Sequence, residues 1–191
     1  MQKVMITTLW EGNVVPIVIY KLTPKKVILV MDDNPQRKKA ALELKKKFPR
    51  LKFESVKVHE FDVPEVTKII VEAAKKEEGN EIYIHVTEGR KTMFLGGIFA
   101  ASLLKEKTRG AFYLREDNNE LMAVPLMEFK LSETKSTILH ELERGNTKVA
   151  DIAGKANVHR SLIYAAIKDM TKSGLVTEEW KLTDAGKIMV M

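Results

Sequence analysis

The sequence predicts an α/β fold: a Rossmann-like, mostly parallel sheet with a C-terminal hairpin, followed by a small winged helix-turn-helix domain. Strand-like and helix-like segments alternate over the first 130 residues, which is typical of a parallel sheet covered on both faces. Gly110–Arg115 and Glu120–Phe129 flank Asn118 and Asn119, as the arms of a hairpin do. From about Ser132, short amphipathic helices replace this pattern. We therefore place the domains at residues 1–130 and 131–191.

The remaining strands of the front domain are predicted by their apolar patterns. Lys3–Leu9 is rich in β-branched residues, and Val27–Met31 is an unbroken apolar run, typical of a strand buried on both faces. Leu51–Val58 alternates as a half-buried strand does, and Glu81–Thr87 is the fourth strand in chain order.

Helices are expected between these strands. Asn13–Leu22 ends at a Thr-Pro turn, and Pro35–Phe48 is strongly basic. Pro64–Glu78 is amphipathic with proline in its first turn, where the missing N–H costs nothing. Thr92–Lys105 has little polar surface, so we expect it to be mostly covered.

The C-terminal segment places apolar residues at helical spacing on either side of a turn. A helix within Ser132–Gly145 precedes a short second helix that ends at Asn157, a residue type that tolerates the left-handed backbone of a tight turn. A third helix ends at Gly174, and Leu175–Glu178 with Trp180–Thr183 are the expected strands of a short wing. The residues expected to point inward are Ile138, Leu139, Leu142, Ile152, Ala153, Ala156, Leu162, Ile163, Ala166, Ile167 and Met170.

The outer face of the third helix is the candidate DNA-binding surface. We expect Arg160, Ser161, Tyr164 and Lys168 to be outermost, where a recognition helix meets base edges and phosphates. Residues 132–191 hold nine Lys/Arg against eight Asp/Glu, so the order of motifs, not charge, carries this prediction. Two adjacent glutamates in the wing would repel phosphate. The alternative is a helical dimerisation module that does not bind DNA.

Composition excludes several classes of protein. With 45% hydrophobic and 30% charged residues the chain is globular, and without cysteine it has no disulfide and no thiolate zinc site. The four histidines are scattered, so we expect no metal site. The apolar run Met93–Leu104 is too short to span a bilayer, and nothing resembles a signal peptide, which indicates a cytoplasmic protein. Nine basic residues between Arg37 and Lys57 are interpreted as a solvated helix face, or alternatively as a positive field toward nucleic acid.

Two loops are expected to bind a ligand: Thr7–Asn13 after the first strand and Thr87–Thr92 after the fourth. Both lie at the carboxyl edge of the sheet, where open α/β sheets bind ligands beside the point at which strand order reverses. They offer hydroxyls, an aromatic face, glycines, two cations and a helix N-terminus, which suit an oxyanion. The alternative is a pair of plain strand-to-helix turns capped by threonine. The candidate ligand-binding residues are Thr7, Thr8, Leu9, Trp10, Gly12, Asn13, Thr87, Glu88, Gly89, Arg90, Lys91 and Thr92.

Small residues recur on the helix that follows the second of these loops. Gly96, Gly97, Ala100 and Ala101 permit a close approach of another backbone. They predict either tight packing on the protein's own sheet or a symmetric dimer contact beside the pocket.

The whole chain resembles the CRISPR-associated transcriptional regulators that join a CARF domain (CRISPR-associated Rossmann fold) to a winged helix. The resemblance rests on two segments, Met5–Leu9 and Thr87–Met93, and on the order of the domains. The resemblance implies a homodimer that binds cyclic oligoadenylate, with tetra-adenylate as the expected ring, across its two-fold axis, and duplex DNA as the second partner. It maps the family's glycine-rich loop onto Thr87, Gly89, Arg90 and Lys91, and the first loop onto Thr7–Asn13. Where many relatives have a small residue this chain has Glu88, which is expected to point away or to contact a ribose hydroxyl.

Enzymatic activity is the second hypothesis. No phosphate-binding Walker loop or dinucleotide fingerprint is present, and we expect neither a catalytic residue nor a cofactor beyond the effector ring. Some CARF domains slowly cleave their ring without metal, for which Lys91, Arg90 and Thr8 would be the candidates here. A third hypothesis is a repressor that responds to a small metabolite in the same pocket.

Overall fold

Six strands form one sheet in the front part of the chain. In the computed structural model, which describes residues 1–191, they lie in the order β3-β2-β1-β4-β5-β6. Neighbouring strands are parallel except for the antiparallel pair β5 and β6, so the predicted Rossmann-like α/β class is confirmed. The strands are β1 (Lys3–Thr8), β2 (Lys26–Met31), β3 (Lys52–Lys57), β4 (Glu81–His85), β5 (Ala111–Leu114) and β6 (Leu121–Ala123).

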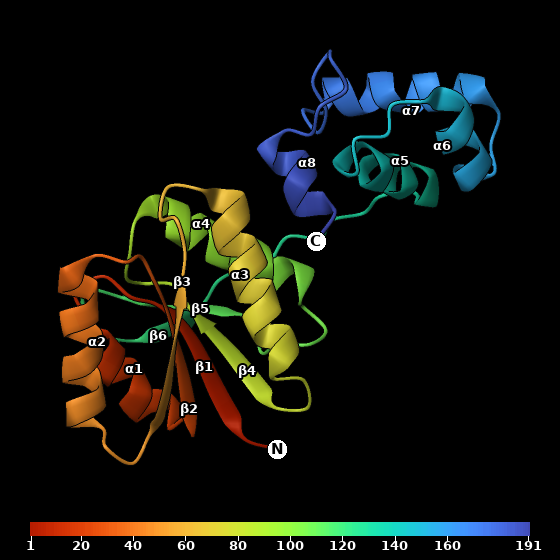
Figure 1. Cartoon of the computed structure of the whole chain (residues 1–191). Coiled ribbons are helices and arrows are strands. Elements are labelled where there is room, and N and C mark those ends of the chain that lie inside the picture. Colours follow the sequence, from red (N-terminus) through yellow and green to blue (C-terminus); the bar gives the residue numbers. More distant parts are fainter. The chain divides into compact units, whose positions relative to one another are not determined.

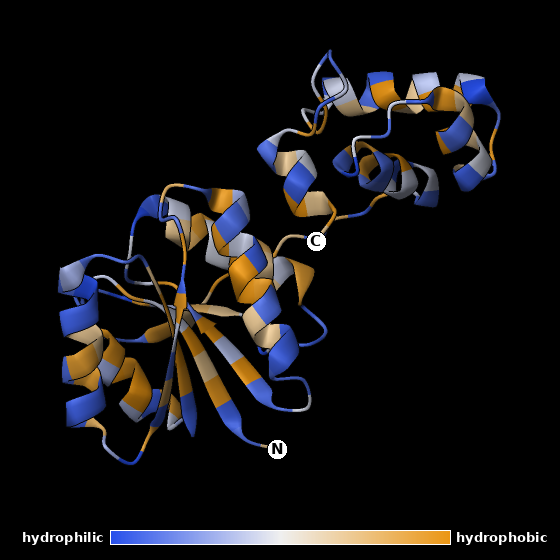
Figure 2. Ribbon diagram, in the orientation of Figure 1, coloured by the Kyte–Doolittle hydropathy of each residue, from blue (hydrophilic) through white to orange (hydrophobic).

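Helices cover both faces of this sheet, with α1 and α2 on one face and α3 and α4 on the other (Figure 1). Successive strand residues point to opposite faces, so Ile6 joins the core under α3 and α4 while Met5 joins the core under α1 and α2. Burial on both faces explains the unbroken apolar run Val27–Met31 of β2, and Figure 2 shows hydrophobic residues along the strands of the sheet. The helices are α1 (Val15–Leu22), α2 (Pro35–Lys47), α3 (Val63–Lys76) and α4 (Lys91–Leu103).

The small-residue patch of α4 is an internal packing surface. A Cβ added at Gly96 would lie 2.6 Å from Cγ1 of Val66 on α3, and one added at Gly97 would lie 2.4 Å from Cγ1 of Val86. The two neighbouring alanines of the patch are fully buried. The patch therefore lets α4 approach α3 and the sheet of its own chain, and the interpretation of these four residues as a dimer contact is wrong.

The last strand is shorter than the sequence predicts. Glu120–Phe129 was expected to be extended throughout, but β6 covers only Leu121–Ala123. The final backbone hydrogen bond of this pairing runs from the amide of Val124 to the carbonyl of Ala111, at 2.8 Å. The next residue is Pro125, which has no N–H to donate, so the pairing ends there.

The chain forms two compact units, Met1–Glu128 and Phe129–Met191. The second unit consists of helices that surround a core of their own, which includes Ile138, Ile152, Ile163 and Met170. Asn157 has φ 51° and ψ 46°, the predicted left-handed conformation, at the turn between two of these helices. None of the helices in the chain has the length and apolar character needed to cross a membrane. The helices of this unit are α5 (Glu133–Glu143), α6 (Val149–Ala156), α7 (Arg160–Lys172) and α8 (Asp184–Met189).

Two details of the second unit differ from the prediction. Leu162 was expected in the core but is 54% exposed, because the buried stripe of α7 runs through Ile163 and Ile167 and Leu162 lies roughly 100° round the helix from it. The two expected wing strands reduce to a single antiparallel bridge between Val176 and Leu182. Trp180, with φ 62°, forms the turn between them, and α8 follows directly.

Candidate ligand site at the carboxyl edge of the sheet

The loops after β1 and β4 lie side by side because these two strands are neighbours at the point where strand order reverses. The hydroxyl of Thr8 donates to the backbone carbonyl of Glu88. The Glu88 carboxylate turns back into the β1–α1 loop and accepts three backbone N–H groups, from Trp10 at 3.1 Å, Gly12 at 2.7 Å and Val14 at 2.7 Å. Glu88 is only 8% exposed, so it points into the protein and not toward a ligand.

Two glycines allow this close pairing of loops. Gly12 has φ 79° and Gly89 has φ 105°, a left-handed region that side chains rarely adopt. A Cβ at Gly89 would also lie 3.0 Å from Sδ of Met93. A residue other than glycine at position 89 would therefore strain the loop and push it away from α4.

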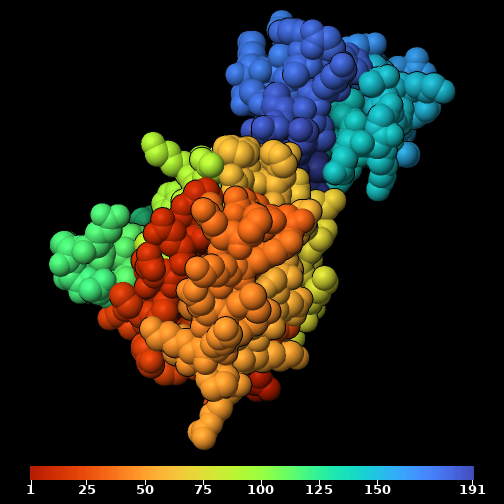
Figure 3. Space-filling view, turned by 60° about the vertical axis from the view of Figure 1, so that its left-hand side comes forward, coloured from red at the N-terminus to blue at the C-terminus, as the bar shows by residue number.

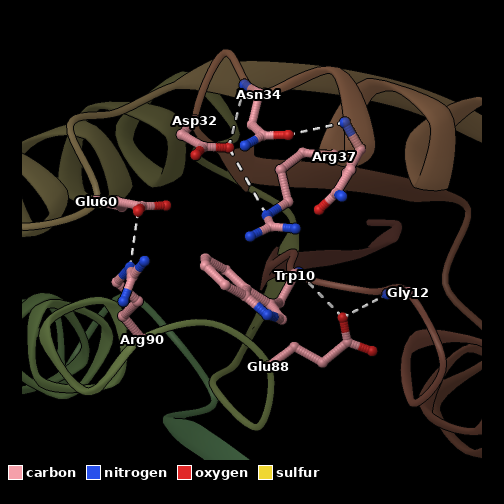
Figure 4. Close-up of polar contacts among 9 residues, drawn as sticks. Trp10, Gly12, Asp32, Asn34, Arg37, Glu60, Glu88 and Arg90 are labelled. Atoms are coloured by element: carbon pink, nitrogen blue, oxygen red, sulfur yellow. Dashed lines mark hydrogen bonds and ion pairs between the residues drawn. The ribbon is translucent and has the colours of Figure 1, made fainter.

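Trp10 is the centre of an aromatic and cationic cluster (Figure 4). The guanidinium carbon of Arg37, from the start of α2, lies 3.2 Å from the centroid of the indole ring. The guanidinium carbon of Arg90 lies 4.9 Å from the same ring and 4.4 Å from the ring of Phe61, in the β3–α3 loop. Cation–π attraction favours all three contacts. The cluster thus joins side chains from three loops and from the start of α2, all at the carboxyl edge.

Charge in this cluster is only partly neutralised. Arg90 donates from Nε to Glu60 at 2.7 Å, whereas Nε of Arg37 lies 3.8 Å from the carboxylate of Asp32 and has no hydrogen-bond partner. Arg37 is nevertheless only 5% exposed. A buried guanidinium with an unused donor favours an acceptor such as a phosphate or carboxylate oxygen. The arrangement can therefore hold an anion next to an aromatic ring.

The structure brings some of the predicted ligand-binding residues to this edge and buries others. Trp10, Asn13, Arg90 and Lys91 are accessible, and the two glycines shape their loops. Thr7, Thr8, Leu9 and Glu88 are buried and do not face the site, whereas Thr87 and Thr92 are half-buried and their hydroxyls form hydrogen bonds within the protein.

Each of these corrections has a physical reason. Thr7 is completely buried because both faces of β1 are covered, and Leu9, directly after β1, is completely buried in the core under α1 and α2. The hydroxyl of Thr87 accepts the amide N–H of Leu114 at 2.7 Å, which ties the loop to β5. Thr92 donates to the backbone carbonyl of Glu60. These side chains build the loops, and their polar groups are used within the protein.

Arg37 and Phe61 belong to the cluster but were not singled out in the sequence. Arg37 was assigned to a solvated basic helix, and its neighbours on that helix, such as Lys38 and Lys39, are indeed exposed. The missed signal was position: both residues follow the second and third parallel strands within a few residues, and all parallel strands deliver their next loop to the same edge. Figure 3 shows the β1–α1 loop in red, the start of α2 in orange and the start of α4 in yellow-green together on one side of this unit.

The second unit presents a separate candidate surface on α7. Arg160, Ser161, Tyr164 and Lys168 are all exposed, as is Leu162. The helix is capped by the side chain of the residue before it, a histidine whose ring nitrogen accepts the amide of Ser161 at 3.4 Å. The ring of Tyr164 meets Trp180 of the short hairpin edge-on at 6.0 Å between centroids.

Fold and site together define a Rossmann-like domain with an aromatic and cationic cluster at the carboxyl edge of its sheet, followed by a small helical unit. The chain belongs to the family described as HFX_2341_N-like, N-terminal, whose family model matches residues 10–119. Residues 125–191 match the N-terminal domain of the methanogenesis regulatory protein FilR1. No curated protein matches the sequence.

Can2 shares the fold of this chain at low sequence identity, and two further solved structures align more weakly. Can2 from Sulfobacillus thermosulfidooxidans, in complex with cyclic tetra-adenylate, aligns with a TM-score of 0.51 and 14% identity over 98% of this chain and 62% of Can2. A type III CRISPR defence DNA nuclease activated by cyclic oligoadenylate aligns at 0.47 and 14%, over 80% of this chain and 29% of that one. VC1899 from Vibrio cholerae aligns at 0.46 and 11%, over 98% and 64%. This chain spans less than two thirds of each of these proteins.

Proposed function

We propose that this protein is a CARF-type, ligand-gated transcriptional regulator of CRISPR-associated genes. It binds a cyclic oligoadenylate, tetra-adenylate first, in the front unit, and duplex DNA through α7. The observation that carries the proposal is the cluster of Trp10, Arg37, Arg90 and Phe61 at the carboxyl edge of the sheet. Aromatic rings stack on bases and guanidinium groups bind phosphates, which are the two chemical components of such a ring.

A homodimer is the assembly that matches this ligand best. One chain supplies a single Trp10 cluster, whereas a cyclic tetra-adenylate repeats its base and phosphate around a closed ring, so a symmetric pair of clusters matches it better than one. Phe94 and Leu95 are 37% and 43% exposed in the first turns of α4, beside the exposed Lys91. They provide apolar surface for a second copy next to the site. The fold shared with Can2, whose structure holds cyclic tetra-adenylate, supports the choice of ligand.

DNA binding is assigned to the second unit. Arg160 and Lys168 supply cations for phosphates, Ser161 supplies a hydrogen-bonding group, and the unexpected exposure of Leu162 adds an apolar group of the kind that meets thymine methyl groups. The match of residues 125–191 to a domain of a regulatory protein supports a regulatory role. A ring that favours one of two dimer states would change the affinity for DNA.

Calorimetric titration with cyclic tetra-adenylate, with linear tetra-adenylate as control, tests the proposal. We expect tight binding of the ring at one ring per two chains and much weaker binding of the linear form. Absence of heat with the ring would contradict the proposal. One small metabolite bound per chain would instead indicate the metabolite-responsive repressor.

We propose binding without cleavage as the activity of the front unit. Thr8, one of the three residues that ring cleavage would use, is buried and its hydroxyl already donates to the carbonyl of Glu88. Incubation of the protein with cyclic tetra-adenylate and separation of the products by chromatography tests this proposal. Linear products that disappear in Lys91→Ala would show that the protein is a slow ring nuclease.

A further inference from the structure

We infer that Glu88 occupies, with its own carboxylate, the loop position in which open α/β folds commonly hold a phosphate of the ligand, and that it thereby positions Trp10. The inference deepens the proposed function, because it concerns the same site. Glu88 is a positioning residue, since it contacts the loop that carries Trp10 and not the ligand.

The geometry of the β1–α1 loop carries this inference. In Rossmann-like folds the first strand-to-helix turn directs backbone N–H groups at an anionic ligand. Here the N–H groups of Trp10, Gly12 and Val14 converge instead on the two oxygens of Glu88. The carboxylate is almost fully buried. These three N–H donors already share one anion, so they are not available to a phosphate.

A phosphate of the ligand is therefore expected to bind the arginines of the cluster and not the backbone N–H groups of the β1–α1 loop. Arg37 and Arg90 flank the indole on the other side of the loop from Glu88 (Figure 4). Arg90 follows Glu88 by two residues, so a ligand that binds Arg90 acts on the same loop that fixes Trp10. The site should consequently discriminate against dinucleotides and nucleoside diphosphates, which need the first loop for their pyrophosphate.

The position of Trp10 can be tested by fluorescence without the ring. The chain has two tryptophans, so the Trp180→Phe variant leaves Trp10 as the single reporter. In this background we compare Glu88→Ala with the matched control Glu11→Ala, which removes an exposed carboxylate from the same loop. Quenching of Trp10 by acrylamide should rise about threefold or more in Glu88→Ala, because the freed N–H groups lose their buried acceptor and the loop opens. It should stay unchanged in Glu11→Ala.

Rescue by a small carboxylate separates positioning from general packing. Sodium acetate, titrated to about 100 mM, should fill the vacated position in Glu88→Ala and restore low quenching, since a ligand of the closed loop stabilises it. Sodium chloride at equal ionic strength should not. Quenching in Glu88→Ala equal to that in Glu11→Ala, or acetate no better than chloride, would overturn the inference.

A second variant keeps the test valid if Glu88→Ala does not fold. Glu88→Gln retains one acceptor oxygen and should give quenching between that of the parent and that of an open loop. Quenching identical to the parent would overturn the inference. These measurements use no ring, so a failure of ring binding leaves them intact, and a failure of the Glu88 test leaves the proposed ring binding standing.

Discussion

At the scale of single residues, the site depends on charged side chains that are taken out of water. Arg37 is buried against Trp10 with a distant counter-ion, and Glu88 is buried against backbone donors. Charges are kept inside proteins only where other groups compensate for lost hydration. The three backbone N–H groups compensate the lost hydration of the Glu88 carboxylate, whereas Asp32 compensates that of the Arg37 guanidinium only in part. Arg37 is therefore the residue whose charge an incoming anion would stabilise most.

Replacement of Arg37 by alanine should weaken ring binding by about tenfold or more, because a charge-assisted hydrogen bond and the support of the indole are lost together. Lys39→Ala, on the exposed side of the same helix, is the matched control. Calorimetric titration with cyclic tetra-adenylate measures both variants. Equal affinities for the two would remove Arg37 from the site.

His85 predicts a pH dependence of the front unit. It is completely buried on β4, with Nδ1 2.8 Å from the hydroxyl of Thr7, and burial lowers its pKa from 6.5 to about 4. The unfolded chain therefore binds a proton more readily, and stability falls as the pH drops from 6.5 toward 4, by about 3 kcal/mol in total. Urea unfolding followed by Trp10 fluorescence, in the Trp180→Phe background, should show this slope. In His85→Asn the contribution should vanish, and a slope retained in full would assign it to other groups.

At the scale of elements, helices are joined by specific contacts as well as by apolar packing. In the second unit Glu141 of α5 is buried and accepts hydrogen bonds from Lys155 of α6 and Asn146 at 2.7 Å each, and from Arg144 at 3.0 Å. In the front unit the close approach of α3 and α4 depends on Gly96. Both contacts can be tested by mutation, because each one fixes the position of one helix relative to another.

The second unit should lose stability in acid as the pH falls from 4.5 toward 2. Hydrogen bonds from Lys155 and Asn146 lower the pKa of Glu141 from 4.5 to about 2. The depressed value means that the stabilisation is complete above pH 4.5 and is lost as the pH falls toward 2. Fluorescence of Trp180 in a Trp10→Phe background follows this unit. Glu141→Gln should be less stable at neutral pH and show a flatter acid profile; an unaltered profile would contradict the assignment.

Gly96→Ala should destabilise the front unit by about 1–3 kcal/mol, because the new methyl group would lie 2.6 Å from Cγ1 of Val66 and force α3 and α4 apart. Gly154→Ala on α6 is the control, since nothing lies within 4 Å of an added Cβ there. It should stabilise its helix by about 0.5–1 kcal/mol. Urea unfolding measures both, and a neutral Gly96→Ala would show that the contact between α3 and α4 is looser than the structure indicates.

At the scale of the whole molecule, the two units carry different chemistry. The front unit combines an aromatic ring with cations at one sheet edge, and the second unit exposes a polar helix face. In the proposed regulator, ring binding and DNA binding should be separable by mutation, although their binding free energies are coupled. The proposed division of labour can therefore be tested with one variant in each unit.

Arg160→Ala should weaken binding of duplex DNA with ring affinity nearly unchanged, and Arg90→Ala should do the reverse. Each replaced contact is worth about 1–3 kcal/mol. Fluorescence anisotropy with labelled duplexes and calorimetry with the ring measure the two activities on the same preparations. Loss of both activities in both variants would contradict the separation.

The sequence by itself determined the α/β order, the sheet with its terminal hairpin, and the turn at Asn157, because local periodicity and turn chemistry report on backbone structure. It also located the loops around Trp10 and Arg90, since loops after parallel strands share one edge. Only the tertiary structure decided which side chains face a ligand. Burial of Thr7, the inward turn of Glu88 and the placement of Arg37 against Trp10 depend on contacts between residues far apart in the chain, which no local pattern encodes.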